Sequence, residues 1–326
     1  MRTIVGEPLG SPARTRDPER AALRVGLVQH QWRDDPAELE AVLDDGIGSA
    51  AQAGAKIVFL PELTLSRYPA EVRPETPPGG TAEPLESGPT HTFAARAAKQ
   101  HGVHVHASLY ERAEGPDGLG YNTAMLVDPD GRVVARTRKL HIPVTAGYYE
   151  DHYFRPGPAD DPYPVVEVGV TGAPRLGMPT CWDEWFPEVA RAYALGGADL
   201  LVYPTAIGSE PDHPDFDTEP LWRQVIVGHA IANGLFVVVP NRWGSEGLLT
   251  FYGSSFVADP YGRVLASAPR SGDVALVATL DLDQRRDWLE LFPFLRTRRP
   301  DTYGALTAPR TDAPTDVAPT DPRRNP

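Results

Sequence analysis

The sequence predicts an α/β protein in which two mixed β-sheets pack together and helices cover the outside. Three observations support this prediction. Apolar runs of strand length alternate with amphipathic helical segments, two predicted hairpins interrupt that alternation, and 326 residues with 41% hydrophobic content are sufficient for one large core. Strand–helix units favour parallel strands, whereas hairpins are antiparallel, so both sheets should be mixed.

The first half of the chain is expected to form five strands and two helices. The first helix is amphipathic because Leu39, Leu43 and Ile47 recur at helical spacing. The last two strands flank an Asp-Pro-Asp-Gly turn, which predicts a hairpin. The strands are expected at 23–28, 56–60, 103–110, 121–127 and 132–139, and the helices at 37–53 and 90–101.

The second half repeats this pattern with six predicted strands and two helices. An Asp-Pro-Tyr-Gly turn separates two of the strands and predicts a second hairpin. The strands are expected at 175–180, 200–203, 235–239, 254–258, 264–268 and 274–282, and the helices at 186–196 and 219–233.

Two terminal segments differ in composition from the rest of the chain. Residues 1–22 are polar with scattered Gly, Pro and Arg, which predicts a flexible N-terminal arm. Residues 307–326 contain Val317 as their only large apolar residue, which predicts a disordered tail. One domain is therefore expected over 23–306, with a long surface loop at 69–87 that is rich in Pro, Glu and Gly.

Composition and charge argue against several classes of protein. A net charge of −13 without a basic stripe argues against nucleic-acid binding, and no apolar run is long enough to cross a membrane. A single cysteine excludes an internal disulfide and fits a cytoplasmic location. No glycine-rich nucleotide-binding fingerprint is present, and His104 and His106 lack partners at metal-ligand spacing, so we expect neither a cofactor nor a metal.

Three chemically capable residues lie at or near the ends of predicted strands: Glu62, Lys139 and Cys181. Taken singly, they could be an exposed glutamate, part of a basic surface patch and an inert buried thiol. Taken together, they form a set for acyl transfer, in which a carboxylate removes the thiol proton and an ammonium stabilises the oxyanion. The set needs no histidine.

The segments around these residues resemble motifs of the nitrilase, or carbon–nitrogen hydrolase, superfamily. The matching segments are Phe-Leu-Pro-Glu-Leu at 59–63, Arg-Lys-Leu-His-Ile-Pro at 138–143 and Cys-Trp-Asp-Glu-Trp-Phe-Pro-Glu at 181–188, together with 121–124 and 298–303. The resemblance covers roughly residues 23–306 and implies a four-layer αββα sandwich. It also implies a homo-oligomer, a dimer or larger, that acts on a small-molecule substrate.

The resemblance further implies a role for each residue of the site. Cys181 would attack and form an acyl-enzyme, Glu62 would serve as base and then acid, and Lys139 would stabilise the oxyanion together with the backbone N–H of Trp182. Glu150 lies where the family carries a second glutamate that orients the lysine and the substrate, although it could instead be a surface charge beside its neighbour.

Within the family, the chain is similar to the group that hydrolyses N-carbamoylputrescine. Segments 203–211, 241–242, with Asn241, and 251–256 resemble that group. Relatives that act on N-carbamoyl amino acids resemble one another in having an arginine just after the nucleophilic cysteine. Here Asp183 and Glu184 follow the nucleophile instead, and two acids there would suit a cationic amine. Glu210 could pair with a distal ammonium, or be a loop charge.

One segment departs from that group and leaves the substrate open. Residues 64–69, which include Arg67 and Tyr68, line the pocket in relatives, and here they differ from the putrescine type. Arg67 could oppose a cationic substrate or bind an anionic one. The alternatives are therefore an amidase for an N-carbamoyl amino acid or ω-amide, or a catalytically silent scaffold.

Overall fold

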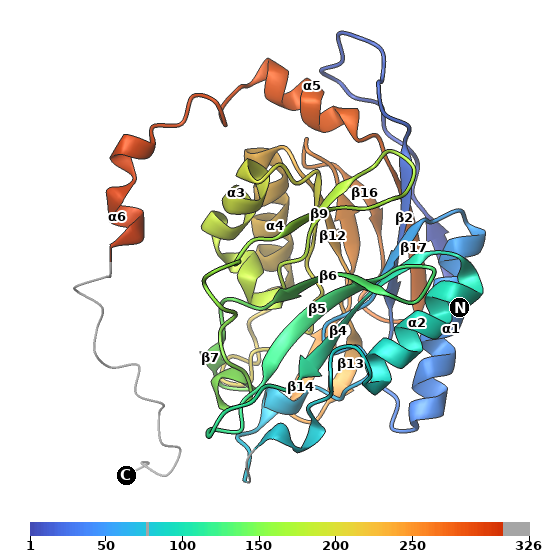
Figure 1. Cartoon of the computed structure of the whole chain (residues 1–326), viewed down its shortest axis with the longest axis vertical. Coiled ribbons are helices and arrows are strands. Elements are labelled where there is room, and N and C mark those ends of the chain that lie inside the picture. Colours follow the sequence, from blue (N-terminus) through green and yellow to red (C-terminus); the bar gives the residue numbers. More distant parts are fainter. Residues whose placement is uncertain (76–77, 309–326) are drawn as a thin grey trace. The chain divides into compact units, whose positions relative to one another are not determined.

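The computed structural model describes residues 1–75 and 78–308, and the chain divides into two compact units, Met1–Phe292 and Pro293–Pro326. Figure 1 traces the chain from end to end. The described part of the second unit contains a 3₁₀ helix, Pro300–Thr302, and the helix α6 (Gly304–Thr307). Most of the predicted tail, residues 309–326, lies outside the described residues.

The first unit contains two mixed sheets, as predicted, and these have seven and six strands. The seven-stranded sheet has the order β1 (Arg2–Val5), β17 (Val274–Leu280), β2 (Leu23–Gln29), β3 (Ile57–Phe59), β4 (His104–Glu111), β5 (Tyr121–Val127) and β6 (Val133–Arg138). The six-stranded sheet has the order β16 (Val264–Ser267), β15 (Phe256–Ala258), β12 (Phe236–Val239), β11 (Leu200–Val202), β10 (Arg175–Gly177) and β9 (Val165–Glu167).

Both predicted hairpins are confirmed, and the strands that follow helices are parallel. The hairpins are the antiparallel pairs β5–β6 and β15–β16. The strands β2, β3 and β4 run parallel in one sheet, and β10, β11 and β12 run parallel in the other. The carboxyl ends of these parallel strands are where polar side chains collect in α/β proteins.

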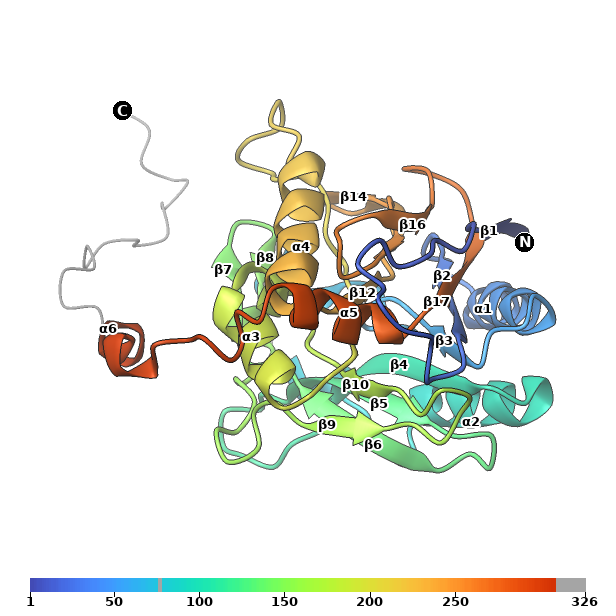
Figure 2. The same ribbon diagram turned by 90° about the horizontal axis from the view of Figure 1, so that it is seen from above.

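Two apolar layers hold the sandwich together. One contains inward-facing residues of both sheets, such as Leu27, Phe59, Leu200 and Phe236, and fills the space between them. The other packs helices α1 (Pro36–Gln52) and α2 (Pro89–His101) on the outer face of the seven-stranded sheet. The helices α3 (Pro187–Leu195) and α4 (Glu219–Asn233) lie on the opposite side of the sandwich (Figures 1 and 2), which confirms the αββα order.

The N-terminal segment is not the loose arm that composition suggested. It begins with β1, which pairs in parallel with β17 at the edge of the sheet. Further along, Arg14 bonds to Asp281 and Asp287, and Arg20 bonds to Asp199. These charge-assisted bonds and a backbone ladder order a segment that carries few large apolar side chains.

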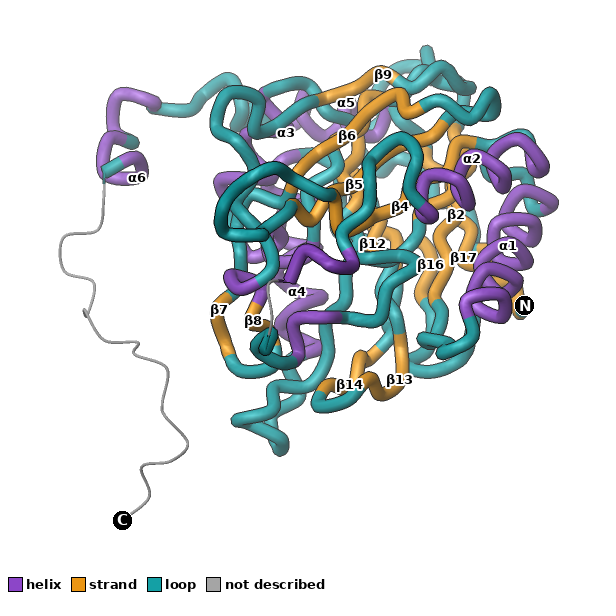
Figure 3. The backbone as a smooth tube through the Cα atoms, turned by 60° about the horizontal axis from the view of Figure 1, so that its bottom comes forward, coloured by secondary structure: helices purple, strands orange, loops and turns teal. Residues whose placement is uncertain are grey.

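Several short elements were not predicted. The helix α5 (Asp283–Leu291) is polar, and the strand pairs β7 (Val144–Thr145) with β8 (Tyr148–Tyr149) and β13 (Trp243–Glu246) with β14 (Leu249–Tyr252) are brief. Figure 3 shows these two short strand pairs, β7–β8 and β13–β14, at one end of the sandwich. No helix in the described part of the chain is long and apolar enough to span a lipid bilayer.

Candidate active site

Glu62, Lys139 and Cys181 are brought to the same end of the sandwich. Each follows a strand, since Glu62 comes after β3, Lys139 directly after β6 and Cys181 after β10. Glu62 and Lys139 are fully buried, and Cys181 is 6% exposed. The topology therefore brings together three residues that lie far apart in the sequence.

Lys139 forms the centre of a buried ion cluster. Its Nζ donates to Glu62 Oε1 at 2.9 Å and to both carboxylate oxygens of Glu150, at 2.9 and 2.7 Å. Burial disfavours the ammonium, but the negative charges of Glu150 and Glu62 outweigh that cost and hold the pKa of Lys139 well above its usual value. Lys139 is consequently a fixed positive charge at neutral pH.

The carboxylate of Glu62 is held by donors on every side. Asn122 Nδ2 donates to Oε1 at 2.7 Å, and the backbone N–H of Ala206 donates to Oε2 at 3.0 Å. Arg242, itself fully buried, donates to the backbone oxygens of Glu62 and Leu63 at 2.6 and 3.0 Å. These bonds stabilise a turn in which Leu63 has a φ of +48°, a conformation that costs energy for a residue with a Cβ.

Glu150 lies on the other side of Lys139 from Glu62. Tyr68 Oη donates to Glu150 Oε1 at 2.8 Å, and the Tyr68 backbone N–H donates to Glu246. Burial raises the pKa of Glu150 to about 7, and the negative charge of Glu62 adds to this rise. The positive charge of Lys139 and the hydrogen bond from Tyr68 both lower the pKa of Glu150. The carboxyl group of Glu150 therefore titrates in the neutral range.

Cys181 occupies a strained position at the start of a 3₁₀ helix, Cys181–Trp185. Its φ is +42°, which is unusual for a residue other than glycine, and its N–H donates to the backbone oxygen of Pro204 at 3.0 Å. Burial and the negative charge of Glu62 raise the thiol pKa well above its usual value, although Lys139 opposes this shift. The resting thiol is thus protonated, and attack requires a base.

A cavity of about 300 Å³ has Cys181 in its wall. Among the described residues that line it, the charged ones are Glu150 and Glu210, and no lysine, arginine or histidine takes part. Burial raises the pKa of Glu210, and His213 opposes that shift. The remaining wall consists of Pro143, Thr145, Tyr148, Trp182, Trp185, Ile207, Phe216, Thr218 and Leu221. A buried thiol, a carboxylate–ammonium pair and an open cavity are the parts that acyl transfer requires.

Comparison with known proteins agrees with this geometry. Residues 24–290 match the model of the carbon–nitrogen hydrolase family. The chain belongs to this family. It is 40% identical to a citrullinase of Francisella tularensis over 294 residues, covering 88% of this chain and 98% of that protein. It is 37% identical to an N-carbamoylputrescine amidase of Solanum lycopersicum over 290 residues, covering 86% and 94%.

Solved structures of carbon–nitrogen hydrolases resemble the chain in fold. A carbon–nitrogen hydrolase from Helicobacter pylori G27 has a TM-score of 0.76 at 30% identity, covering 88% of this chain and 99% of its own. An amidase mutant from Nesterenkonia sp. AN1 has a TM-score of 0.68 at 27% identity, covering 88% and 98%. That amidase carries the acetamide moiety of fluoroacetamide on its active-site cysteine. The chain is accordingly a carbon–nitrogen hydrolase with a cysteine nucleophile.

Two acids that the sequence suggested for cation binding have other partners in this hydrolase. Asp183 accepts from the backbone N–H and Nδ1 of His141, at 3.0 and 2.7 Å, and so connects the turn after Cys181 to the loop after Lys139. Glu184 is fully buried and accepts from Trp222 Nε1 at 2.9 Å. Neither lines the cavity, so the reasoning that this pair faces the substrate is corrected.

The other five residues that the sequence suggested for the pocket have different outcomes. Tyr68 is buried and donates to Glu150 rather than lining the cavity. Asn241 bonds to the backbone of Ile207, which lines the cavity, but Asn241 does not line it itself. Arg67 is half exposed, does not line the cavity and forms an ion pair with Glu71. Trp182 and Glu210 do line it.

Sequence reasoning gave no role to two residues that hold Glu62, namely Asn122 and Arg242. Both lie in segments that resemble the family, and an arginine three residues after a buried strand is a signal, because buried guanidinium groups require several acceptors. The described residues contain no group of three or more His, Cys, Asp or Glu side chains that could hold a metal ion.

Proposed function

We propose that the chain hydrolyses N-carbamoylputrescine to putrescine, ammonia and CO2 through an acyl-enzyme on Cys181. The observation that carries this proposal is the charge of the cavity. Its charged lining residues in the described part of the chain are Glu150 and Glu210, and Lys139 is already neutralised by two carboxylates. Such a cavity favours a substrate with an ammonium group and an aliphatic chain.

Glu210 is the proposed partner of the distal ammonium. It lines the same cavity as Cys181, and the apolar side chains of Trp182, Trp185 and Ile207 line it as well. An aliphatic chain can pack against such a wall while its charged end contacts a carboxylate. The ion pair of Arg67 with Glu71 removes the arginine that could have opposed a cation.

The first chemical step is attack of the thiol on the ureido carbon. We propose that Glu62 takes the proton from sulfur, because the thiol is protonated at rest and Glu62 is the carboxylate whose charge acts on it most strongly. The negative charge that forms on oxygen is stabilised by Lys139 and the backbone N–H of Trp182. Glu62 then returns the proton to the leaving nitrogen as the C–N bond breaks.

The second step is hydrolysis of the acyl-enzyme. Water attacks the same carbon, Glu62 accepts a proton from it, and the C–S bond breaks with return of that proton to sulfur. Glu150 keeps Lys139 oriented throughout, since it contributes two of the three carboxylate bonds to Nζ. The carbamate product decomposes to CO2 and the remaining amine or ammonia.

Citrulline is the second candidate substrate, supported by the 40% identity to a citrullinase. Its α-carboxylate would need a cation that the described cavity lining does not contain. Ammonia release from N-carbamoylputrescine, citrulline and N-carbamoyl-β-alanine should therefore be measured side by side at equal concentration. Preference in kcat/KM for citrulline or N-carbamoyl-β-alanine, both of which carry a carboxylate, would contradict the proposal.

The Cys181→Ala variant completes this experiment. A scaffold without activity would give the same background ammonia for wild type and variant, whereas the proposed hydrolase gives release only with the thiol present.

We also propose a homo-oligomer, consistent with the half-exposed Leu195 and Leu221 on α3 and α4, and light scattering would test it.

A further inference from the structure

The segment from Glu62 to Tyr68 carries two parts of the ion cluster, although it is neither a helix nor a strand. Glu62, at its beginning, accepts from Lys139, and Tyr68, at its end, donates to Glu150. The residues between them form turns, and Leu63 has a φ of +48°. Without a regular ladder of hydrogen bonds, such a segment is positioned by its contacts with other parts of the chain.

A buried ion pair, Arg242 with Glu246, contacts both ends of this segment. Arg242 donates to the backbone oxygen of Glu62 at 2.6 Å and to that of Ser66 at 3.3 Å. Its Nη1 also donates to both carboxylate oxygens of Glu246, at 2.8 and 3.0 Å, and Glu246 accepts from the backbone N–H of Tyr68 at 2.9 Å. The two side chains of the pair are 0% and 1% exposed, so these bonds form without competition from solvent.

These contacts close a ring of hydrogen bonds around the segment. The ring passes in order through Lys139, Glu62, Arg242, Glu246, Tyr68 and Glu150, and it returns to Lys139. Arg242, Glu246 and Tyr68 do not line the active-site cavity. Their effect on the reaction must therefore pass through Glu62 and Glu150.

We infer that Arg242 and Glu246 are positioning residues of this hydrolase. Arg242 fixes Glu62 through the main chain, and Glu246 fixes Tyr68, whose hydroxyl group donates to Glu150. A guanidinium group suits this task, because its planar fork presents several donors in a fixed geometry. The inference rests on the ion cluster and does not depend on which carbamoyl compound the enzyme hydrolyses.

Glu150 reports on this positioning, because its carboxyl group titrates in the neutral range. The bond from Tyr68 lowers the pKa of Glu150, so displacement of Tyr68 should raise that pKa. His30, beside the ion pair, is neutral in this range, because burial and the charge of Arg242 lower its pKa to about 4. The ionisable groups that act on Glu150 are Glu62 after β3, Lys139 after β6, Cys181 after β10 and Tyr68, and Glu210 lines the same cavity.

The test is the pH profile of kcat/KM for the Glu246→Gln variant of the full-length chain. The substrate is the fastest of N-carbamoylputrescine, citrulline and N-carbamoyl-β-alanine. Glutamine has the same size but binds Arg242 and the Tyr68 N–H without a charge, so Tyr68 should be held less firmly. We expect the acid limb to move to higher pH by about half a unit and kcat to fall about fivefold, with KM unchanged.

The direction of this shift separates positioning from a simple charge effect. Loss of the negative charge of Glu246 would by itself lower the pKa of Glu150 and move the limb to lower pH. Partial unfolding would lower kcat without moving the limb, and thermal unfolding shows that each variant is folded. Arg242→Lys, which keeps the charge but loses the fork, should move the limb in the same direction and gives the same measurement if Glu246→Gln does not fold.

Combination with Tyr68→Phe tests how the effect reaches Glu150. If Glu246 acts through the Tyr68 hydroxyl, Glu246→Gln should move the acid limb no further once that hydroxyl is removed. A further shift of the same size in the Tyr68→Phe background would overturn the inference, because Glu246 would then act on Glu150 by another route.

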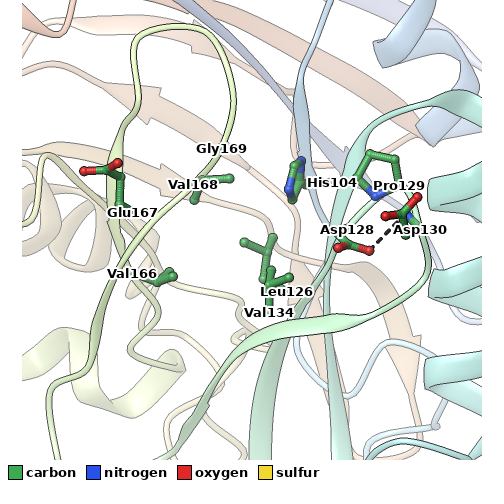
Figure 4. A pocket seen from close by; sticks show the side chains of 10 residues that line it. All are labelled: His104, Leu126, Asp128, Pro129, Asp130, Val134, Val166, Glu167, Val168 and Gly169. Carbon is green, nitrogen blue, oxygen red and sulfur yellow. Dashed lines mark hydrogen bonds between the residues drawn. The ribbon is translucent and has the colours of Figure 1, made fainter.

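Two control variants remove a carboxylate outside the ring. Asp259→Asn is the matched control, because Asp259 is fully buried and pairs with Arg263 four residues later, as Arg242 pairs with Glu246. Asp128→Asn removes a carboxylate that lines a separate hollow of about 440 Å³ (Figure 4), and no described residue lines both this hollow and the active-site cavity. Neither control should move the acid limb.

Three results of the single variants would contradict this role. The acid limb of Glu246→Gln could stay in place or move to lower pH, and either result would overturn the inference whether or not Tyr68→Phe moves the limb. An equal shift in Asp259→Asn or Asp128→Asn would overturn it as well, because the change in overall charge would then explain the effect.

Discussion

Replacing Tyr68 with phenylalanine removes one hydrogen bond from the buried carboxylate of Glu150. The Tyr68 hydroxyl donates to Oε1 at 2.8 Å, and Lys139 remains as the second donor group. The pKa of Glu150 is about 7, with burial raising it and the Tyr68 bond among the contributions that lower it. Loss of that bond should therefore raise the pKa further.

The size of the shift follows from the strength of the bond. A hydrogen bond to a charged group contributes roughly 1.5–3 kcal/mol, and one pKa unit corresponds to about 1.4 kcal/mol. Since Lys139 retains both of its bonds to Glu150, we expect the lower end, about one unit. If the ionised carboxylate is needed to orient Lys139, the acid limb of the kcat/KM profile should move to higher pH by about one unit.

The assay is ammonia release against pH for wild type and Tyr68→Phe. Activity should fall about tenfold below the limb and remain nearly unchanged on the alkaline side. Tyr110→Phe is the matched control, because Tyr110 is equally buried but donates to the backbone oxygen of Tyr153, outside the ion cluster. An acid limb that stays in place, or moves equally in the control, would refute the reasoning.

Three further predictions follow from the packing and charges around the site. Asp183→Ala should lower the free energy of unfolding by about 3 kcal/mol in urea titration, because it leaves the donors of His141 without an acceptor; a change as small as that of an exposed site would contradict this. Gly208→Ala should lower stability by about 2 kcal/mol and reduce kcat/KM, because its Cβ would lie 2.2 Å from the backbone oxygen of Thr250. Gly228→Ala, which has open space, is its control and should be neutral or stabilising. Glu210→Gln should raise KM for N-carbamoylputrescine about tenfold with little change in kcat, and an unchanged KM would remove Glu210 from substrate binding.

The regular part of the fold could be predicted because each element carries its own signal. Apolar runs such as 200–203 coincide with buried strands, and both hairpin turns contain a glycine with positive φ, Gly131 and Gly262. The edge strand β1 carries no such signal, since its residues are mostly exposed and its pairing with β17 uses backbone groups. The helix α5 is similar, because its buried residues, Asp283, Gln284 and Asp287, are polar.

In the site, the sequence predicted the position of residues better than their direction. Ends of strands indicated Glu62 and Cys181, because parallel strands deliver their carboxyl ends to one edge. The direction of Asp183 and Glu184 depends on partners far away in the sequence, His141 and Trp222, which no local pattern reveals. The cavity therefore owes its charge to Glu150 and Glu210 instead.

The most direct test of the account is to look for the covalent intermediate on the single thiol. N-carbamoylputrescine is mixed with the enzyme, and the reaction is quenched with acid during turnover. The masses of the intact chain and of its Cys181 peptide are then measured by mass spectrometry. The account predicts a substrate-derived acyl adduct confined to Cys181 in wild type and absent from Cys181→Ala. Turnover that releases ammonia in the Cys181→Ala variant, or an adduct on another residue, would contradict it.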